Sequence, residues 1–393
     1  MENNTTERQK SEITAPLLSI VIPTKDRYTT LIPVVDSFLN HIIGDDYEIV
    51  IQDNSGDNTP WKEYAQSRQD EKIKYFYHAE SLSVSENTDM AISNLSGKYA
   101  IFIGDDDLVS PYVLEITKYL DKHNVDCLAY SPGYYWWSSV NFVKESYYRH
   151  KQAFWLPNNI SFKLQQKDSS KELEYLLKSG GVVLYPSLPK FYHGLVKKEV
   201  LDKIKTKIGT YISGSCPDMA LAVSLTLVVD NYHYMQYPIS VFGASKNSAA
   251  GWGQENKHWG KLEDQKHLPK NIMWDENIPR VWTGNTIYAQ AIYETLSVFK
   301  ADKKINYNAL YAASIINEKQ IASYVYPIVW SFNKGNIVRY FHLFYYLLRK
   351  FAGKTLTTWR ERKKKLSYDV STIDNVEGCM LFLAKQTKPD FKT

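Results

Sequence analysis

Strand-type and helix-type patterns alternate along the first third of this chain. Short apolar runs at residues 17–22, 47–52 and 99–103 have the length and composition of buried strands, and periodic segments lie between them. The apolar residues of the first periodic segment recur at spacings of four, three and four, as one helix face requires: Leu31, Val35, Phe38 and Ile42. This alternation predicts an α/β fold built on a mostly parallel sheet with helices on both faces.

A polar loop follows each of the three predicted strands. The loops are Pro23–Arg27, the turn that begins at Asp53, and the acidic run Asp105–Asp107. The carboxyl ends of parallel strands lie at one edge of a sheet, where α/β proteins bind their ligands. We therefore expect these three loops to line one pocket.

The run Asp105–Asp107 carries the clearest chemical signal. Three adjacent carboxylates repel one another unless a cation neutralises them. Carboxylate oxygens suit Mg²⁺ or Mn²⁺, which can in turn hold a diphosphate. Ser110 and Pro111 predict a helix start just after the run, with Ser110 as the N-cap. A solvated acidic turn beside an N-cap is the alternative interpretation.

Other nucleotide-binding and metal motifs are not found in the sequence. Gly251-Trp252-Gly253 lacks the third glycine of a dinucleotide fingerprint, and Leu348 stands where a P-loop ending at Gly353-Lys354-Thr355 would have its first glycine. The three cysteines are too far apart for a zinc site or redox pair, and they favour a reduced, cytoplasmic setting.

Length and composition indicate a globular protein with room for two domains. The chain has 393 residues, of which 44% are hydrophobic and 23% charged. Residues 1–15 form a predicted disordered polar tail without the apolar core of a secretory signal. No stretch reaches ~18 uninterrupted apolar residues, so we expect no membrane-spanning helix. The 30 Tyr and 10 Trp residues supply flat amphipathic surfaces that suit sugar rings or a membrane interface.

Four segments together resemble the family 2 glycosyltransferases, whose nucleotide-binding fold is called GT-A. They are Ser19–Arg27, the turn Glu48–Asp57, Asn87, and Gly97–Asp107. The resemblance implies a GT-A catalytic domain, a nucleotide-diphosphate sugar donor with a uracil-type base, Mn²⁺ or Mg²⁺ as cofactor, and inversion at the anomeric carbon. It implies a saccharide or lipid-linked saccharide as acceptor.

The resemblance also assigns donor-side residues. Pro23, Thr24 and Arg27 would line the base and phosphate end of the site, with Asn87 nearby, and Asp53 would accept a hydrogen bond from the base. Asp105, Asp106 and Asp107 would hold ribose and metal, with Asp106 and Asp107 as the candidate metal ligands and Asp106 the first choice. Gly104 and Glu86 depart from the family, which often has Asp and Arg at these positions, so the choice of metal ligand and one phosphate contact stay open.

Asp218 is the predicted general base. Inverting transfer requires a group that takes the proton of the attacking hydroxyl, and the usual choice is a carboxylate at the pocket wall. Asp218 stands at the start of a predicted helix, where the family carries its base. The alternative is an aspartate that only interacts with the helix dipole.

Acceptor contacts are predicted from His193 and from the aromatic-rich region at residues 130–190, including Trp136 and Trp137. Core packing is the alternative for these side chains. Lys246, in a polar loop, could stabilise the leaving diphosphate, and a plain solvated loop explains it equally well.

The C-terminal region is predicted to be mainly helical, with a basic amphipathic segment at residues 337–366. Residues 339–366 contain nine Lys or Arg and one Glu, so this stretch carries +8 in a chain whose net charge is +4. Such a helix can lie on an anionic membrane surface. Packing on the catalytic domain, with a solvated basic end, is the alternative.

We therefore predict a tail (1–15), a GT-A catalytic domain (16–250, with a donor half at about 16–125 and an acceptor half at about 126–250), and a helical region (251–393). The predicted function is metal-dependent, inverting transfer of one sugar in bacterial surface polysaccharide synthesis, in the cytoplasm or on the inner membrane face. A non-catalytic scaffold of the same fold is the main alternative. A sugar-1-phosphate nucleotidylyltransferase is disfavoured because the loop after the first strand has no glycine, and no nucleic-acid partner is expected.

Overall fold

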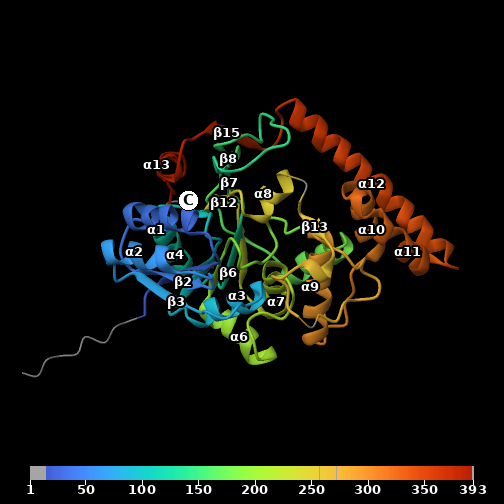
Figure 1. Cartoon of the computed structure of the whole chain (residues 1–393), viewed down its shortest axis with the longest axis horizontal. Helices are drawn as coiled ribbons and strands as arrows, with labels where there is room; N and C mark the ends of the chain where they lie inside the picture. Colours follow the sequence, from blue (N-terminus) through green and yellow to red (C-terminus); the bar gives the residue numbers. More distant parts are fainter. Residues whose placement is uncertain (1–14, 256, 271, 392–393) are drawn as a thin grey trace, which may run out of the picture.

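The computed structural model describes residues 15–255, 257–270 and 272–391, and its N-terminal part alternates strands and helices as predicted (Figure 1). Apart from Ala15, the predicted tail lies outside the described residues. The alternating elements are β1 (Leu18–Thr24), α1 (Tyr28–His41), β2 (Tyr47–Asp53), α2 (Thr59–Ser67), β3 (Ile73–Tyr77), α3 (Val84–Ser93) and β4 (Tyr99–Phe102).

The main sheet has eight strands in the order β3-β2-β1-β4-β10-β6-β11-β9. The later strands are β6 (Cys127–Tyr130), β9 (Gln165–Gln166), β10 (Gly194–Lys197) and β11 (Tyr232–Met235). Neighbours from β3 to β4 are parallel, whereas β10 runs antiparallel to both β4 and β6, and β9 antiparallel to β11. Six of the eight strands share one direction, which confirms the prediction of a mostly parallel sheet.

Helices cover both faces of this sheet because side chains of a strand alternate between faces. Leu18, Ile20 and Ile22 of β1 pack in one core with Leu31 and Phe38 of α1. Val21 of β1 points the other way and packs in a second core with Ala91 and Ile92 of α3. Further helices complete the layers: α4 (Val113–Lys122), α5 (Ser169–Lys178), α6 (Lys198–Ile208) and α7 (Pro217–Val228).

A second, five-stranded sheet was not predicted. Its order is β15-β8-β7-β12-β5, formed by β5 (Leu108–Val109), β7 (Gly133–Trp136), β8 (Ala153–Pro157), β12 (Ser240–Ala244) and β15 (Tyr368–Thr372). The predicted N-cap at Ser110 is wrong for this reason: Leu108 and Val109 stay extended to pair with β12, and α4 begins only after Tyr112.

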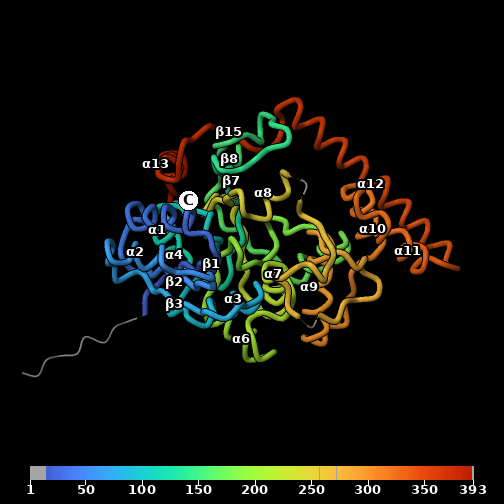
Figure 2. The backbone as a smooth tube through the Cα atoms, viewed as in Figure 1, coloured from blue at the N-terminus to red at the C-terminus, as the bar shows by residue number. Residues whose placement is uncertain are grey.

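The C-terminal region is largely helical, but its end returns to the first domain. After α8 (Ala249–Gln254) and the short pair β13 (Trp259–Gly260) and β14 (Trp282–Thr283) come α9 (Gly284–Val298), α10 (Tyr307–Asn317), α11 (Ala322–Asn333) and α12 (Ile337–Arg362). Strand β15 then pairs with β8, and α13 (Val376–Gln386) packs beside α1 (Figures 1 and 2). Met380 and Leu383 of α13 belong to the same core as β1, so residues 251–393 do not form one separate helical unit. In the part of the chain that the structure describes, no helix has the length and hydropathy needed to span a membrane.

Candidate active site

The three predicted loops meet at the carboxyl edge of the main sheet. Parallel pairing sets Thr24, the last residue of β1, beside Asp53, the last residue of β2. The Thr24 hydroxyl donates a 2.6 Å hydrogen bond to Oδ2 of Asp105, which follows β4. Residues from three separate loops are therefore held within one polar cluster.

Arg27 supplies the positive charge of this cluster. Its guanidinium lies 3.1 Å from Oδ1 of Asp105 and 2.7 Å from Oδ2 of Asp106, and it donates a 2.9 Å hydrogen bond to the Ser245 hydroxyl. Burial alone would lower the pKa of Arg27, but the charges of Asp105 and Asp106 raise it above its ordinary value. The site is thus built to hold a cationic group between two carboxylates.

Asp105 and Asp106 are buried acids whose pKa values are raised, although Arg27 lies beside both. Burial raises the pKa of Asp105 to about 7, although Arg27 opposes the shift. Burial likewise raises the pKa of Asp106, again against Arg27 and with the neighbouring charge of Asp107 adding to the rise. Additional positive charge at this place would stabilise both ionised carboxylates.

Asp107 has a different environment, and the structure argues against it as a metal ligand. Oδ2 accepts hydrogen bonds from the backbone N–H of Gly104 (2.6 Å), the Tyr192 hydroxyl (3.0 Å) and Nε2 of His193 (3.0 Å), and Oδ1 accepts one from the backbone N–H of Gly243 (2.6 Å). Burial would raise the pKa of Asp107, but His193 and these donors lower it. Its oxygens are occupied by the protein, so Asp107 ties three loops together.

His193 and Trp136 do not lie where an acceptor could touch them. His193 is fully buried, and its Nδ1 lies 2.6 Å from the Ser240 hydroxyl while Nε2 contacts Asp107. Trp136 is buried in a cluster with Val140. Both acceptor predictions are therefore corrected, because packing in the interior uses these side chains.

Trp137 and Lys246 lie at the rim of the cluster. Trp137 is half-buried, and its indole N–H donates a 2.8 Å hydrogen bond to the backbone oxygen of Asp106. Lys246 is exposed in the turn after β12, directly next to Ser245, whose backbone N–H donates to Oδ2 of Asp106 at 3.0 Å. Trp137 also packs against the core around β1 and α1, so its contact with an acceptor and that of Lys246 with a diphosphate stay predictions.

On the donor side, Asn87 leaves an acceptor unpaired. Helix α3 begins at the predicted capping box of Ser83 and Glu86, and Asn87 Nδ2 donates to the backbone oxygen of Thr24 over 3.4 Å. The Oδ1 of Asn87 is buried and has no hydrogen-bond partner. An unpaired buried acceptor costs about 1–3 kcal/mol, so this oxygen suits a donor group on a ligand.

Asp53 is buried and already holds three donors. Its Oδ2 accepts from the hydroxyls of Tyr28 and Tyr75, both at 2.6 Å, and its Oδ1 accepts from the backbone N–H of Ser55 at 2.8 Å. These bonds fix the turn after β2 beside Pro23, which is half-buried. A contact of Asp53 with a nucleobase stays a prediction.

Asp218 lies in the first turn of α7 and is partly exposed. Its carboxylate has no hydrogen-bond partner among the residues that the structure describes. Burial raises the pKa of Asp218 to about 7, and the charge of Asp107 adds to the shift. Burial, Asp107 and then Asp218 raise the pKa of Tyr192, so the three groups share one electrostatic environment.

Residues 19–173 match the model of the family described as Glycosyl transferase family 2. This segment is a family 2 glycosyltransferase domain. It contains the loops after β1, β2 and β4, whereas Asp218, Gly243 and Ser245 lie beyond it. The mixed α/β architecture agrees with the predicted GT-A type.

Individual relatives are more distant. A stretch of 93 residues is 31% identical to the GalNAc(5)-diNAcBac-PP-undecaprenol beta-1,3-glucosyltransferase of Campylobacter jejuni, covering 23% of this chain and 30% of that protein's length. The crystal structure of S. aureus TarS 1-349 in complex with UDP-GlcNAc has a TM-score of 0.44 at 11% identity, covering 86% of this chain and 91% of that chain. The crystal structure of a longer S. aureus TarS chain has a TM-score of 0.40 at 13% identity, and the match covers 79% of this chain and 50% of that chain.

The family 2 domain offers only part of a metal site. Within residues 15–255, 257–270 and 272–391, no group of three His, Cys, Asp or Glu side chains is arranged to hold a metal ion. Asp105 and Asp106 nevertheless converge on a cationic group, Arg27. Mg²⁺ is commonly bound by one or two carboxylates with substrate phosphates and waters. Arg27 already occupies the position between the two carboxylates, so binding of a metal ion at Asp106 together with a diphosphate stays a prediction.

Sequence reasoning missed the contribution of Gly243, Ser245 and Tyr192. Ser245 contacts both Arg27 and Asp106, and Tyr192 contacts Asp107. The available signals were weak: Gly243 and Ser245 stand beside Lys246 in the segment predicted to be a polar loop, and Tyr192 is one of 30 tyrosines.

Replacing Gly243 by alanine is expected to destabilise the protein by about 1–3 kcal/mol, as an overpacked core does. A Cβ at this position would lie 1.7 Å from the backbone oxygen of Asp106, so β12 would have to move away from the acidic loop. Urea unfolding measures the change. Gly253→Ala is the matched control, because a Cβ there meets nothing within 4 Å. Equal stability of both variants would contradict the close packing of β12 on this loop.

Proposed function

We propose that this protein transfers one sugar, with inversion, from a UDP-linked sugar to a saccharide acceptor in bacterial surface polysaccharide synthesis. The observation that carries the proposal is the meeting of Arg27, Asp105 and Asp106 at one sheet edge, with the unpaired Asp218 in the same electrostatic environment. Residues of about 16–125 would bind the donor and residues of about 126–250 the acceptor.

The proposed roles follow from the environment of each residue. Asp218 takes the proton from the acceptor hydroxyl as its oxygen attacks the anomeric carbon and the bond to the diphosphate breaks. Arg27 and Lys246 stabilise the negative charge that grows on the leaving diphosphate. Mn²⁺ or Mg²⁺ bound at Asp106 would add positive charge there. Asn87 and the Asp53 turn position the nucleoside.

Nucleotide release tests this proposal directly. The full chain is incubated with a panel of nucleotide sugars and candidate saccharide acceptors, in Mn²⁺ or in EDTA, and thermal shift reports donor binding separately. We expect UDP release in Mn²⁺ only. Donor binding and release that persist in EDTA would remove the metal from the proposal. Neither binding nor release with any nucleotide sugar would favour the non-catalytic scaffold.

The pH dependence of kcat/KM provides a further prediction. Asp218 must be ionised to accept a proton, and its raised pKa of about 7 means that it is protonated in acid. We expect kcat/KM to rise with pH through about 7 and then level off, because this parameter reports the free enzyme. Initial rates at limiting donor across a series of buffers measure it. A profile that is flat from pH 5 to pH 8 would contradict a base with this pKa.

We also propose that the enzyme acts at the inner face of the cytoplasmic membrane, where a lipid-linked saccharide is the acceptor. The support is the excess of Lys and Arg at residues 339–366, which suits an anionic surface.

A further inference from the structure

Helix α12 turns its apolar face away from the protein. One outward stripe of side chains, each at least 55% exposed, runs along the helix and is called here the α12 stripe: Ile337, Val338, Phe341, Phe344, Tyr345, Leu348 and Phe351. On the opposite side Leu343 is buried, and half-buried Leu347 joins it in the core shared with α10 and α11. Surface helices normally direct polar residues to water. This reversed pattern indicates that something apolar covers the stripe.

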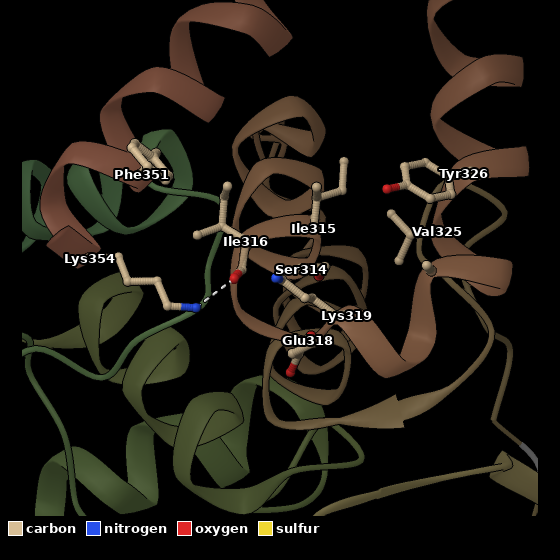
Figure 3. Close-up of a pocket in the computed structure, with 10 residues that line it drawn as sticks. Ser314, Ile315, Ile316, Glu318, Lys319, Val325, Tyr326, Phe351 and Lys354 are labelled. Atoms are coloured by element: carbon tan, nitrogen blue, oxygen red, sulfur yellow. Dashed lines mark hydrogen bonds between the residues drawn. The ribbon is translucent and has the colours of Figure 1, made fainter. Parts of the chain in front are cut away.

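Helix α11 extends the same surface. Tyr326 is 57% exposed and Trp330 65% exposed. Between α10, α11 and α12 lies a cavity of about 530 Å³, within the size range of ligand pockets. Figure 3 shows Phe351 and Lys354 of α12 on one side of it, Val325 and Tyr326 of α11 on the other, and Ile316 of α10 between them. Exposed members of both helices thus border one mostly apolar pocket, whose charged lining residues are Lys319, Lys354 and Glu318.

The charge around the stripe selects among possible occupants. Residues 339–366 include nine Lys or Arg side chains and one acidic side chain, Glu361. The Oε1 atom of Glu361 lies 3.8 Å from Nε of Arg149. A second copy of this chain would bring an equally basic helix against the first, and like charges would oppose the contact. A bilayer with anionic headgroups matches both the apolar stripe and the basic flanks.

We infer that the α12 stripe, together with Tyr326 and Trp330, inserts into the interfacial layer of an anionic bilayer, while the neighbouring basic side chains contact lipid phosphates. The pocket beside Phe351 then opens toward lipid and can admit part of a lipid chain. The inference rests on the proposed membrane contact and extends it, because it makes apolar insertion, and not charge alone, the source of binding.

Sedimentation with vesicles tests the inference. The full chain is mixed with vesicles of phosphatidylcholine alone or with an equal part of phosphatidylglycerol, without donor. The test variant is Phe344→Glu with Leu348→Glu, two positions that are 60% and 55% exposed. The matched control is Val143→Glu with Met273→Glu, which are 72% and 86% exposed and lie outside α11 and α12.

We expect wild type and control to bind phosphatidylglycerol vesicles, and the stripe variant to bind at least about tenfold more weakly. Binding should fall with salt and with omission of phosphatidylglycerol. Failure of the wild type to bind, or equal binding of both variants, would overturn the inference. So would light scattering that shows a lipid-independent dimer in the wild type and a monomer in the stripe variant. Asp218→Asn should bind vesicles normally, so a failed transferase proposal is told apart from a failed membrane inference.

Discussion

Replacing Asp218 by asparagine is expected to lower kcat by about 10²–10⁴-fold while donor affinity stays near that of the wild type. The amide has almost the same shape as the carboxylate but cannot accept the proton of the acceptor hydroxyl. Asp218 has no hydrogen-bond partner among the described residues, so the substitution breaks no bond that holds the fold. Steady-state rates at saturating concentrations of the donor and acceptor found by nucleotide release measure kcat, and thermal shift with the donor measures binding.

Asp168→Asn is the matched control for this experiment. Asp168 is the N-cap of α5, is exposed, and accepts hydrogen bonds from the backbone N–H groups of Ser170 and Lys171. If Asp218 acted only on the dipole of α7, both substitutions would change stability by about 1 kcal/mol or less and leave kcat unaltered. That result would exclude Asp218 as the base.

The predictable part of this structure rests on local signals. The strands ending at Thr24, Asp53 and Phe102 could be read from short apolar runs, and parallel pairing then required their loops to share one edge. The capping box at Ser83 and the helix start at Asp218 depend on a few neighbouring residues. Such signals place a residue on an element and an edge, but they do not show what surrounds its side chain.

The unpredicted part depends on contacts between distant segments. Arg27 and Ser245 are 218 positions apart in the sequence, and no local sequence pattern near either residue predicts their hydrogen bond. Strand β15 likewise could not be predicted, because it pairs with β8, which lies far from it in the sequence. His193 and Trp136 carry side chains typical of binding sites, and only the packing of two sheets shows that both are buried. The sequence therefore predicted the sheet edge formed by the loops after β1, β2 and β4 better than the surroundings that later segments of the chain contribute.

Replacing Asp106 by asparagine is expected to lower kcat/KM at least about 10²-fold, because the diphosphate would lose the cation that we propose for this carboxylate. Asp107→Asn is the matched variant, with the same chemical change one position along the same loop. Isothermal titration of Mn²⁺ in the presence of UDP separates the two. We expect Asp106→Asn to lose Mn²⁺-dependent nucleotide binding and folded Asp107→Asn to retain it, since the oxygens of Asp107 are taken by four protein donors.

Stability should change in the opposite order. The pKa of Asp107 is lowered in the folded protein, so its ionised form stabilises the fold at neutral pH, and this contribution is lost as pH falls through the lowered pKa. Asp107→Asn should therefore lower the free energy of unfolding at pH 7 by about 1–3 kcal/mol, as measured by urea unfolding. The pKa of Asp106 is raised, so the fold disfavours its charge, and Asp106→Asn should keep or increase stability. If Asp106→Asn instead destabilises the protein and Asp107→Asn abolishes Mn²⁺-dependent binding, Asp107 is the metal ligand and Asp106 the residue that ties the loops together.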